Sequence, residues 1–133
     1  MDIKVSTMTG RVPVTIVHVE GNVDVSTADA FQANVLSLIE GGARHILVDM
    51  EHAPFMSSAG LRALHQIFNK LREVSADNVT DEEMRKGISE GAYKSPHLKL
   101  LNLSENTKVA FDTAGFDMFI ETFTDRQTAI NSF

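Results

Sequence analysis

The residues from Phe55 to Leu61, FMSSAGL, join two segments with different hydrophobic patterns. Before them, residues 45–50 (HILVDM) form a short apolar run rich in β-branched side chains, which is typical of a buried strand. After them, apolar residues recur at helical spacing, namely Leu61, Leu64, Ile67, Phe68 and Leu71. The stretch therefore predicts a strand, a loop and a helix in succession, with serine hydroxyls at the start of the helix.

Ser57 and Ser58 occupy the point where this helix is expected to begin. The first backbone N–H groups of a helix have no partner inside the helix, and the helix dipole is positive there. A serine at this point can cap the helix, and a phosphate carried by the serine would be stabilised by the helix end. Capping is the commoner role for serine at such a position, so the residues alone leave both roles open.

Further strands and helices are expected on both sides of this junction. The strands are predicted at residues 3–8, 14–19, 44–50, 98–103 and 119–123. The helices are predicted from Ser26 or Thr27 to Gly41, from about Ser58 to Glu73, from Ser104 to Gly115, and from Thr124 or Asp125 through Ile130. Because strands alternate with helices from residue 14 onward, the chain is expected to form an α/β fold with parallel strand pairs.

The segment from residue 74 to 96 departs from this alternation. It is polar and carries many charges, and loops of this length are usually functional, disordered or partly helical. Thr80 to Glu83 matches a capping box, which predicts a short helix through Met84 and Ile88. The segment is either a solvated excursion or a flap that contacts a partner.

Composition excludes several classes of function. The chain has 133 residues, the size of one domain, and it has no cysteine, which excludes disulfides and thiolate metal sites. A formal net charge of −6 argues against direct binding to nucleic acid or to anionic membrane surfaces. The apolar runs are too short to cross a bilayer, and residues 1–10 lack the apolar core of a signal peptide. We therefore expect a cytoplasmic protein with no membrane insertion.

An enzymatic role has little support in the sequence. Ser58-Ala59-Gly60 matches the second half of a nucleophile elbow, but Met56 stands where that motif requires a small residue. The five histidines lack the spacing of a metal-binding motif, so neither a metal nor a cofactor is expected. Asp49 ends a strand and is expected to bond loop backbone.

The chain resembles the STAS domain family at three places. These are the strand–FMSSAGL–helix junction, the GNVD turn at residues 21–24, and the helix ending at Gly115–Phe116. The anti-sigma factor antagonists (anti-anti-sigma factors) are the most similar members. In that family the junction usually reads D-S-S/T-G-L, with S-S-A-G-L variants, and the turn usually reads G-E-L-D. The resemblance implies one STAS-like domain over residues 1–133, with a polar insertion at about 74–96. Its mixed sheet would have four to five strands, with about four helices mainly on one face.

The resemblance also implies a function and a site. Ser58 falls on the serine that a partner kinase phosphorylates, and Ser57, where the family often has aspartate, is the alternative. The implied partners are an anti-sigma factor that is also a serine kinase, and a serine phosphatase that resets the switch. The resemblance carries partner-binding roles over to Asn22, Asp24, Ser57, Ser58, Ala59 and Gly60. Arg62 is added to these residues because it lies one helical turn beyond Ser58.

A second function is compatible with the same fold. The chain would then be a STAS module that is not phosphorylated, and that binds a small ligand or acts as a scaffold in a signalling or lipid-transport assembly.

Overall fold

The computed structural model describes residues 1–75, 80–91 and 93–133. Its centre is a five-stranded sheet in the order β1-β2-β3-β4-β5. The strands are β1 (Asp2–Thr9), β2 (Pro13–Glu20), β3 (Ile46–His52), β4 (Leu98–Leu101) and β5 (Thr122–Phe123). β1 runs antiparallel to β2, and every other neighbouring pair is parallel. The predicted mixed α/β sheet is confirmed.

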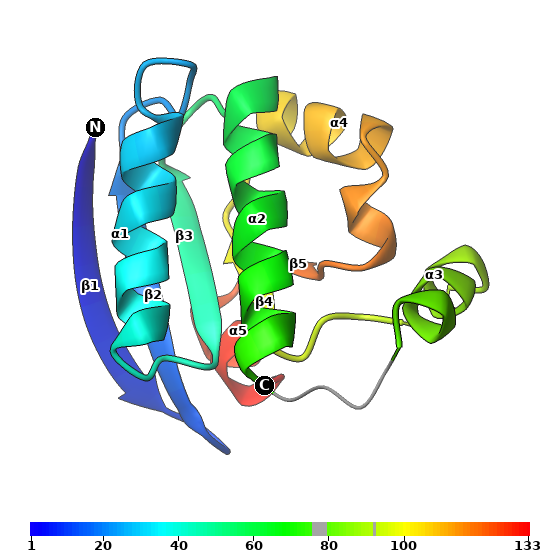
Figure 1. Ribbon diagram of the computed structural model, residues 1–133. Helices are drawn as coiled ribbons and strands as arrows, with labels where there is room; N and C mark the ends of the chain where they lie inside the picture. Colours follow the sequence, from blue (N-terminus) through cyan, green and yellow to red (C-terminus); the bar gives the residue numbers. More distant parts are fainter. Residues whose placement is uncertain (76–79, 92) are drawn as a thin grey trace.

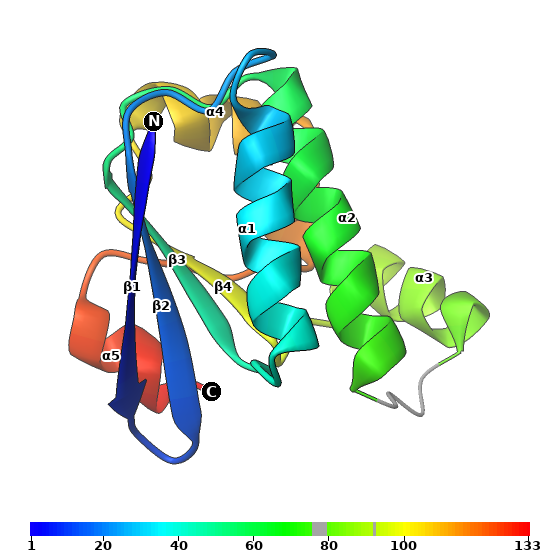
Figure 2. The ribbon, with the colours of Figure 1, turned by 60° about the vertical axis from the view of Figure 1, so that its left-hand side comes forward.

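Helices cover both faces of the sheet, and most of them lie on one face. They are α1 (Ala28–Glu40), α2 (Ser58–Val74), α3 (Asp81–Ser89), α4 (Glu105–Thr113) and α5 (Arg126–Asn131), with a 3-10 turn η1 (Phe116–Met118). α1 and α2 lie side by side on one face of the sheet, and α5 lies on the opposite face (Figures 1 and 2). The fold class is confirmed, with five α-helices in the described residues where about four were expected.

The burial of β3 on both faces explains why its sequence is apolar almost throughout. Ile46 and Val48 belong to the main core beneath α1 and α2, whereas Leu47 belongs to a smaller core beneath α5. All three side chains are fully buried, because successive residues of a strand point to opposite faces and both faces are covered here. The strand before FMSSAGL is therefore fixed from both sides, and it holds the start of α2 in place.

Two predicted strands are shorter in the structure. The strand expected at 98–103 ends at Leu101, since the next residue, Asn102, has a positive φ of 58° that no strand accommodates. The strand expected at 119–123 is reduced to Thr122–Phe123. Phe119 instead ends the η1 turn, and its ring packs 4.9 Å from the ring of Phe68 on α2. Tertiary packing of an aromatic side chain has overridden its strand propensity.

The polar segment contains the predicted short helix, α3. Thr80 is its N-cap, and the Thr80 hydroxyl accepts a hydrogen bond from the Glu83 N–H at 3.1 Å. Residues 76–79 and 92 of the predicted insertion lie outside the described residues.

Candidate functional site

The start of α2 is organised by Ser57. Its backbone is extended, with φ −78° and ψ 177°, and its side-chain oxygen accepts a hydrogen bond from the Gly60 N–H at 3.4 Å. Its own N–H donates to the Val23 carbonyl at 2.8 Å. Ser57 is therefore the N-cap, and Ser58 is the first residue of the helix.

Ser58 presents its hydroxyl to solvent. The residue is exposed, and its hydroxyl forms no hydrogen bond with residues 1–75, 80–91 and 93–133. Arg62, one helical turn further on, is also exposed and forms no ion pair within those ranges. Both sit on a well-anchored helix, since Leu61 and Leu64 are buried on its opposite side. Within the part of the chain that the structure describes, α2 thus carries an unbonded hydroxyl one turn from an unpaired cation.

The loop between β2 and α1 lies against the loop between β3 and α2. The Val23 N–H donates to the Phe55 carbonyl at 2.9 Å, and Val23 forms a parallel bridge with Met56. Gly60 makes this approach possible. A Cβ there would lie 2.5 Å from the Met56 Cγ and 3.0 Å from the Val23 carbonyl oxygen. The glycine of FMSSAGL is required by close packing of two loops that are distant in sequence.

Asp24 holds the turn before α1 in a fixed conformation. Its Oδ1 accepts hydrogen bonds from the Ser26 N–H at 2.9 Å and the Ser26 hydroxyl at 2.6 Å. The hydroxyl bond and then the N–H bond from Ser26, with smaller contributions from Thr27, lower the pKa of the Asp24 carboxyl below its ordinary value. The Thr27 hydroxyl donates to the Asn22 carbonyl at 2.9 Å, which closes the turn. The Asp24 carboxylate is therefore engaged within its own loop.

The residues selected from the sequence thus fall into two groups. Asn22 and Asp24 lie in the turn before α1, and Ser57, Ser58, Ala59, Gly60 and Arg62 lie at the start of α2. The two groups are brought together by the backbone contacts of Val23. Gly60 is buried, so it acts through packing, whereas Asn22, Ser58 and Arg62 are exposed.

Two apolar residues beside this site were not selected from the sequence. Val25 is 84% exposed and Phe55 is 45% exposed, and they lie in the two loops that meet at Val23. A cavity of 330 Å³ between α1 and α2 is lined by Val25, Ala59 and Arg62, among others. An apolar residue next to a polar turn is a weak signal of this surface, because sequence alone does not give exposure.

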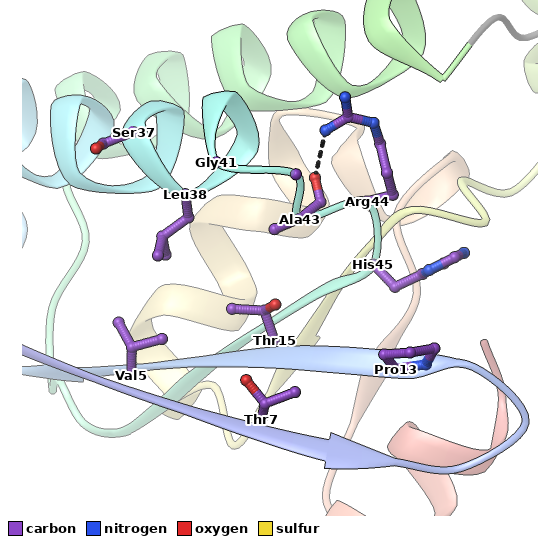
Figure 3. Close-up of a pocket in the computed structure, with 11 residues that line it drawn as sticks. Val5, Thr7, Pro13, Thr15, Ser37, Leu38, Gly41, Ala43, Arg44 and His45 are labelled. Atoms are coloured by element: carbon purple, nitrogen blue, oxygen red, sulfur yellow. Dashed lines mark hydrogen bonds between the residues drawn. The ribbon is translucent and has the colours of Figure 1, made fainter.

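A larger groove lies at the other end of α1 (Figure 3). It has a volume of 540 Å³ and lies between the carboxyl end of α1 and the β1–β2 pair. The Arg44 guanidinium donates to the Ile39 and Ala43 carbonyls at 2.8 and 2.9 Å, and so serves the end of α1. The hydroxyls of Thr7 and Thr15 lie on the opposite wall (Figure 3).

Asp49 lies inside β3, which continues to His52, so the prediction that Asp49 ends a strand and bonds loop backbone is wrong. Its Oδ1 accepts a hydrogen bond at 3.1 Å from the N–H of Glu51, a residue of the same strand. Its Oδ2 lies 3.1 Å from His18 Nδ1, and His18 Nε2 lies 2.9 Å from the Ser6 hydroxyl. Arg126 of α5 approaches the same carboxylate at 3.8 Å. This chain of contacts, which sequence reasoning missed, links β1, β2, β3 and α5 on the face opposite α1.

Two further findings concern the described residues. No group of three or more His, Cys, Asp or Glu side chains among them has the arrangement of a metal site. No helix among them combines the length and apolar character needed to span a bilayer.

The chain belongs to the STAS domain family, whose model matches residues 6–79. It is 28% identical over 102 residues to BtrV of Bordetella bronchiseptica, assigned as an anti-sigma factor antagonist, covering 74% of this chain and 87% of BtrV.

Solved structures show the same fold. A structure from Thermotoga maritima, assigned to the anti-sigma factor antagonists, has a TM-score of 0.72 at 12% identity, covering 96% of this chain and 91% of that one. Bacillus SpoIIAA in its phosphorylated form has a TM-score of 0.64 at 16% identity, and the match covers 98% of this chain and 97% of SpoIIAA. The predicted membership of the STAS family is confirmed by the family model.

Proposed function

We propose that this protein is an anti-sigma factor antagonist that binds and sequesters an anti-sigma factor with serine kinase activity. Phosphorylation of Ser58 releases that partner, and a serine phosphatase restores the binding form. The protein then acts in the cytoplasm as a regulator of transcription through partner switching, and it catalyses no reaction itself. The observation that carries the proposal is the exposed Ser58 hydroxyl, which is unbonded within the described residues and lies at the first position of α2.

The proposal favours Ser58 over Ser57 as the modified residue. The Ser57 hydroxyl caps α2 and is half-buried, so a phosphate there would displace the cap. A phosphate on Ser58 adds about −1.5 to −2 charges at the positive end of the helix dipole. That end stabilises an anion by roughly 0.3–1 kcal/mol, and Arg62 is within one turn. The fold therefore tolerates the modification.

The partner complex responds in the opposite way. We infer that the partner covers the start of α2 and the turn at residues 21–24, with Val25 and Phe55 as its apolar contacts. Exposed apolar residues bordered by polar ones are typical of protein interfaces. Placing a doubly charged group against a surface that fits a neutral serine costs several kcal/mol, and each 1.4 kcal/mol is tenfold in affinity. Phosphorylation thus lowers the affinity for the partner strongly and changes the stability of the fold little.

The experiment is a binding titration of the purified chain against each serine kinase of the anti-sigma type from its host. Isothermal titration calorimetry compares wild type, Ser58→Ala and Ser58→Asp in the presence of ADP, so that Ser58 of the wild type stays unphosphorylated. We expect one kinase to bind wild type and Ser58→Ala similarly and to bind Ser58→Asp at least tenfold more weakly. Equal affinity for all three forms would refute the proposal, and thermal melting verifies that each variant is folded.

A further inference from the structure

The helix α3 and the carboxyl-terminal half of α2 form the walls of a cavity. α3 lies beside this end of α2 and away from the start of that helix (Figures 1 and 2). The cavity has a volume of 380 Å³, within the range of about 300–1,000 Å³ that small-ligand sites occupy. The STAS family match ends at residue 79, so α3 lies beyond it. One wall of the cavity therefore lies outside the residues that the family model matches.

Four of the residues that line the cavity are apolar, namely Phe68, Met84, Ile88 and Phe119. Phe68 is 1% exposed, and its ring lies 4.9 Å from the ring of Phe119 at an angle of 55°. Met84 and Ile88 face them from α3, four residues apart and hence on one side of that helix. Two aromatic rings opposed by two flexible or branched aliphatic side chains form a slot suited to a flat or branched apolar body.

The polar residues that line the cavity are His65, Asn69, Arg72 and Arg85, so its charged lining residues are cationic. Arg85 lines the cavity, is exposed, and forms no ion pair within residues 1–75, 80–91 and 93–133. His65 lines the same cavity and adds ring nitrogens, and its ring centroid lies 6.5 Å from that of Phe119. None of the described lining residues is Asp or Glu, although the whole chain has a net charge of −6. A basic pocket in an acidic protein selects for anions.

We propose that this cavity binds a small amphiphilic anion, with an aromatic or branched apolar body and one carboxylate, sulfonate or phosphate group. The apolar body lies between the two phenylalanines and α3. The anionic group meets the Arg85 guanidinium, whose planar set of donors matches such groups. The site goes beyond the proposed partner switch, because it uses the opposite end of α2 from Ser58 and gives the polar segment a function of its own.

The test uses two fluorescent probes with the same ring system. 8-Anilinonaphthalene-1-sulfonate carries a sulfonate, and N-phenyl-1-naphthylamine lacks it. Titrated into the full chain, the sulfonate probe is expected to saturate at one molecule per chain and to bind about tenfold more tightly than the neutral probe. Failure to saturate, or equal affinity for the two probes, would overturn the proposal.

Two neighbouring substitutions then locate the site. Arg85→Gln removes the cation that lines the cavity, and Lys86→Gln removes the next cation on the same helix, which is exposed and does not line it. We expect Arg85→Gln to weaken binding of the sulfonate probe about tenfold and to leave the neutral probe unchanged, while Lys86→Gln changes neither. Equal effects of the two substitutions would show a general charge effect and would overturn the assignment.

Amide chemical shifts in a ¹H–¹⁵N spectrum provide an independent readout of position. On addition of the sulfonate probe, the largest shifts are expected in α3, in η1 and in the carboxyl-terminal half of α2. Shifts centred on the start of α2, or on the groove beside Thr7 and Thr15, would contradict the proposed location. Because neither probe depends on Ser58, a failure here leaves the partner-switch proposal unaffected.

Discussion

Replacing Gly60 with alanine isolates the contact on which the candidate site is built. The new Cβ would lie 2.5 Å from Met56 Cγ, 3.0 Å from Val23 Cγ1 and 3.0 Å from the Val23 carbonyl oxygen. Met56 and Val23 are both buried, and the carbonyl belongs to the backbone, so a change of rotamer cannot relieve all three contacts. The loop that carries Val23 has to move away from α2.

The expected cost follows from two opposing effects. An alanine in an ordinary helix position is more stable than glycine by roughly 0.5–1 kcal/mol. Forcing an extra carbon into a packed interior costs about 1–3 kcal/mol. Because the contacts at Gly60 are shorter than packed structures tolerate, the second effect is larger, and we expect a net loss of about 1–2 kcal/mol. In a domain of this size that corresponds to a fall in Tm of roughly 3–10 °C.

The matched control is Gly41→Ala at the end of α1. Gly41 has a φ of −76°, and a Cβ there would lie 3.4 Å from the nearest atom, an ordinary contact. Urea unfolding followed by circular dichroism gives the free energy of unfolding for wild type and both variants. We expect Gly41→Ala to equal or exceed wild type in stability and Gly60→Ala to fall below it. If Gly60→Ala is as stable as Gly41→Ala, the reasoning about the two loops is wrong.

Three further predictions concern stability. Because the pKa of Asp24 is lowered in the folded state, its hydrogen bonds stabilise the fold fully above the ordinary pKa of 3.8. This stabilisation is lost as the pH falls through the lower pKa of the folded state, so Asp24→Asn should flatten the acid limb of a plot of Tm against pH. The pKa of His45 lies below its ordinary 6.5, chiefly because of burial, so the unfolded chain takes up a proton that the folded chain resists. Stability should accordingly decline as the pH falls below about 6.5, and His45→Phe should reduce that decline in the same melting series. Ser57→Ala removes the α2 cap and should lower the free energy of unfolding in urea by about 0.5–1 kcal/mol. This is toward the low end for caps, because the hydrogen bond from Gly60 is long at 3.4 Å. An unchanged unfolding midpoint would show that the Ser57 hydroxyl does not contribute to stability.

Local patterns were sufficient to predict the elements around the site. The apolar run before FMSSAGL and the helical spacing after it are strong signals, and β3 and α2 lie where those signals indicate. Capping predicted the start of α3 and of α4, because Thr80 and Ser104 each accept a hydrogen bond from the N–H three residues later.

The arrangement between distant segments could not be read from the sequence. Whether Ser57 or Ser58 caps α2 is a one-residue distinction that depends on the Ser57 N–H reaching Val23, a residue of another loop. The exposure of Val25 and the contact between His18 and Asp49 depend in the same way on how the elements pack together. The prediction of short strands fails for a related reason. At Phe119, packing against α2 outweighs the local preference for a strand.

The central claim is that Ser58 is the switch, and phosphosite mass spectrometry of the protein purified from its native host tests it most directly. Samples prepared with and without phosphatase treatment, from several growth conditions, should show a phosphate on the Ser58 hydroxyl that disappears on treatment. A phosphate on Ser57 would contradict the assignment of the cap and the switch to different serines. The absence of phosphate at both residues under all growth conditions would contradict the switch itself.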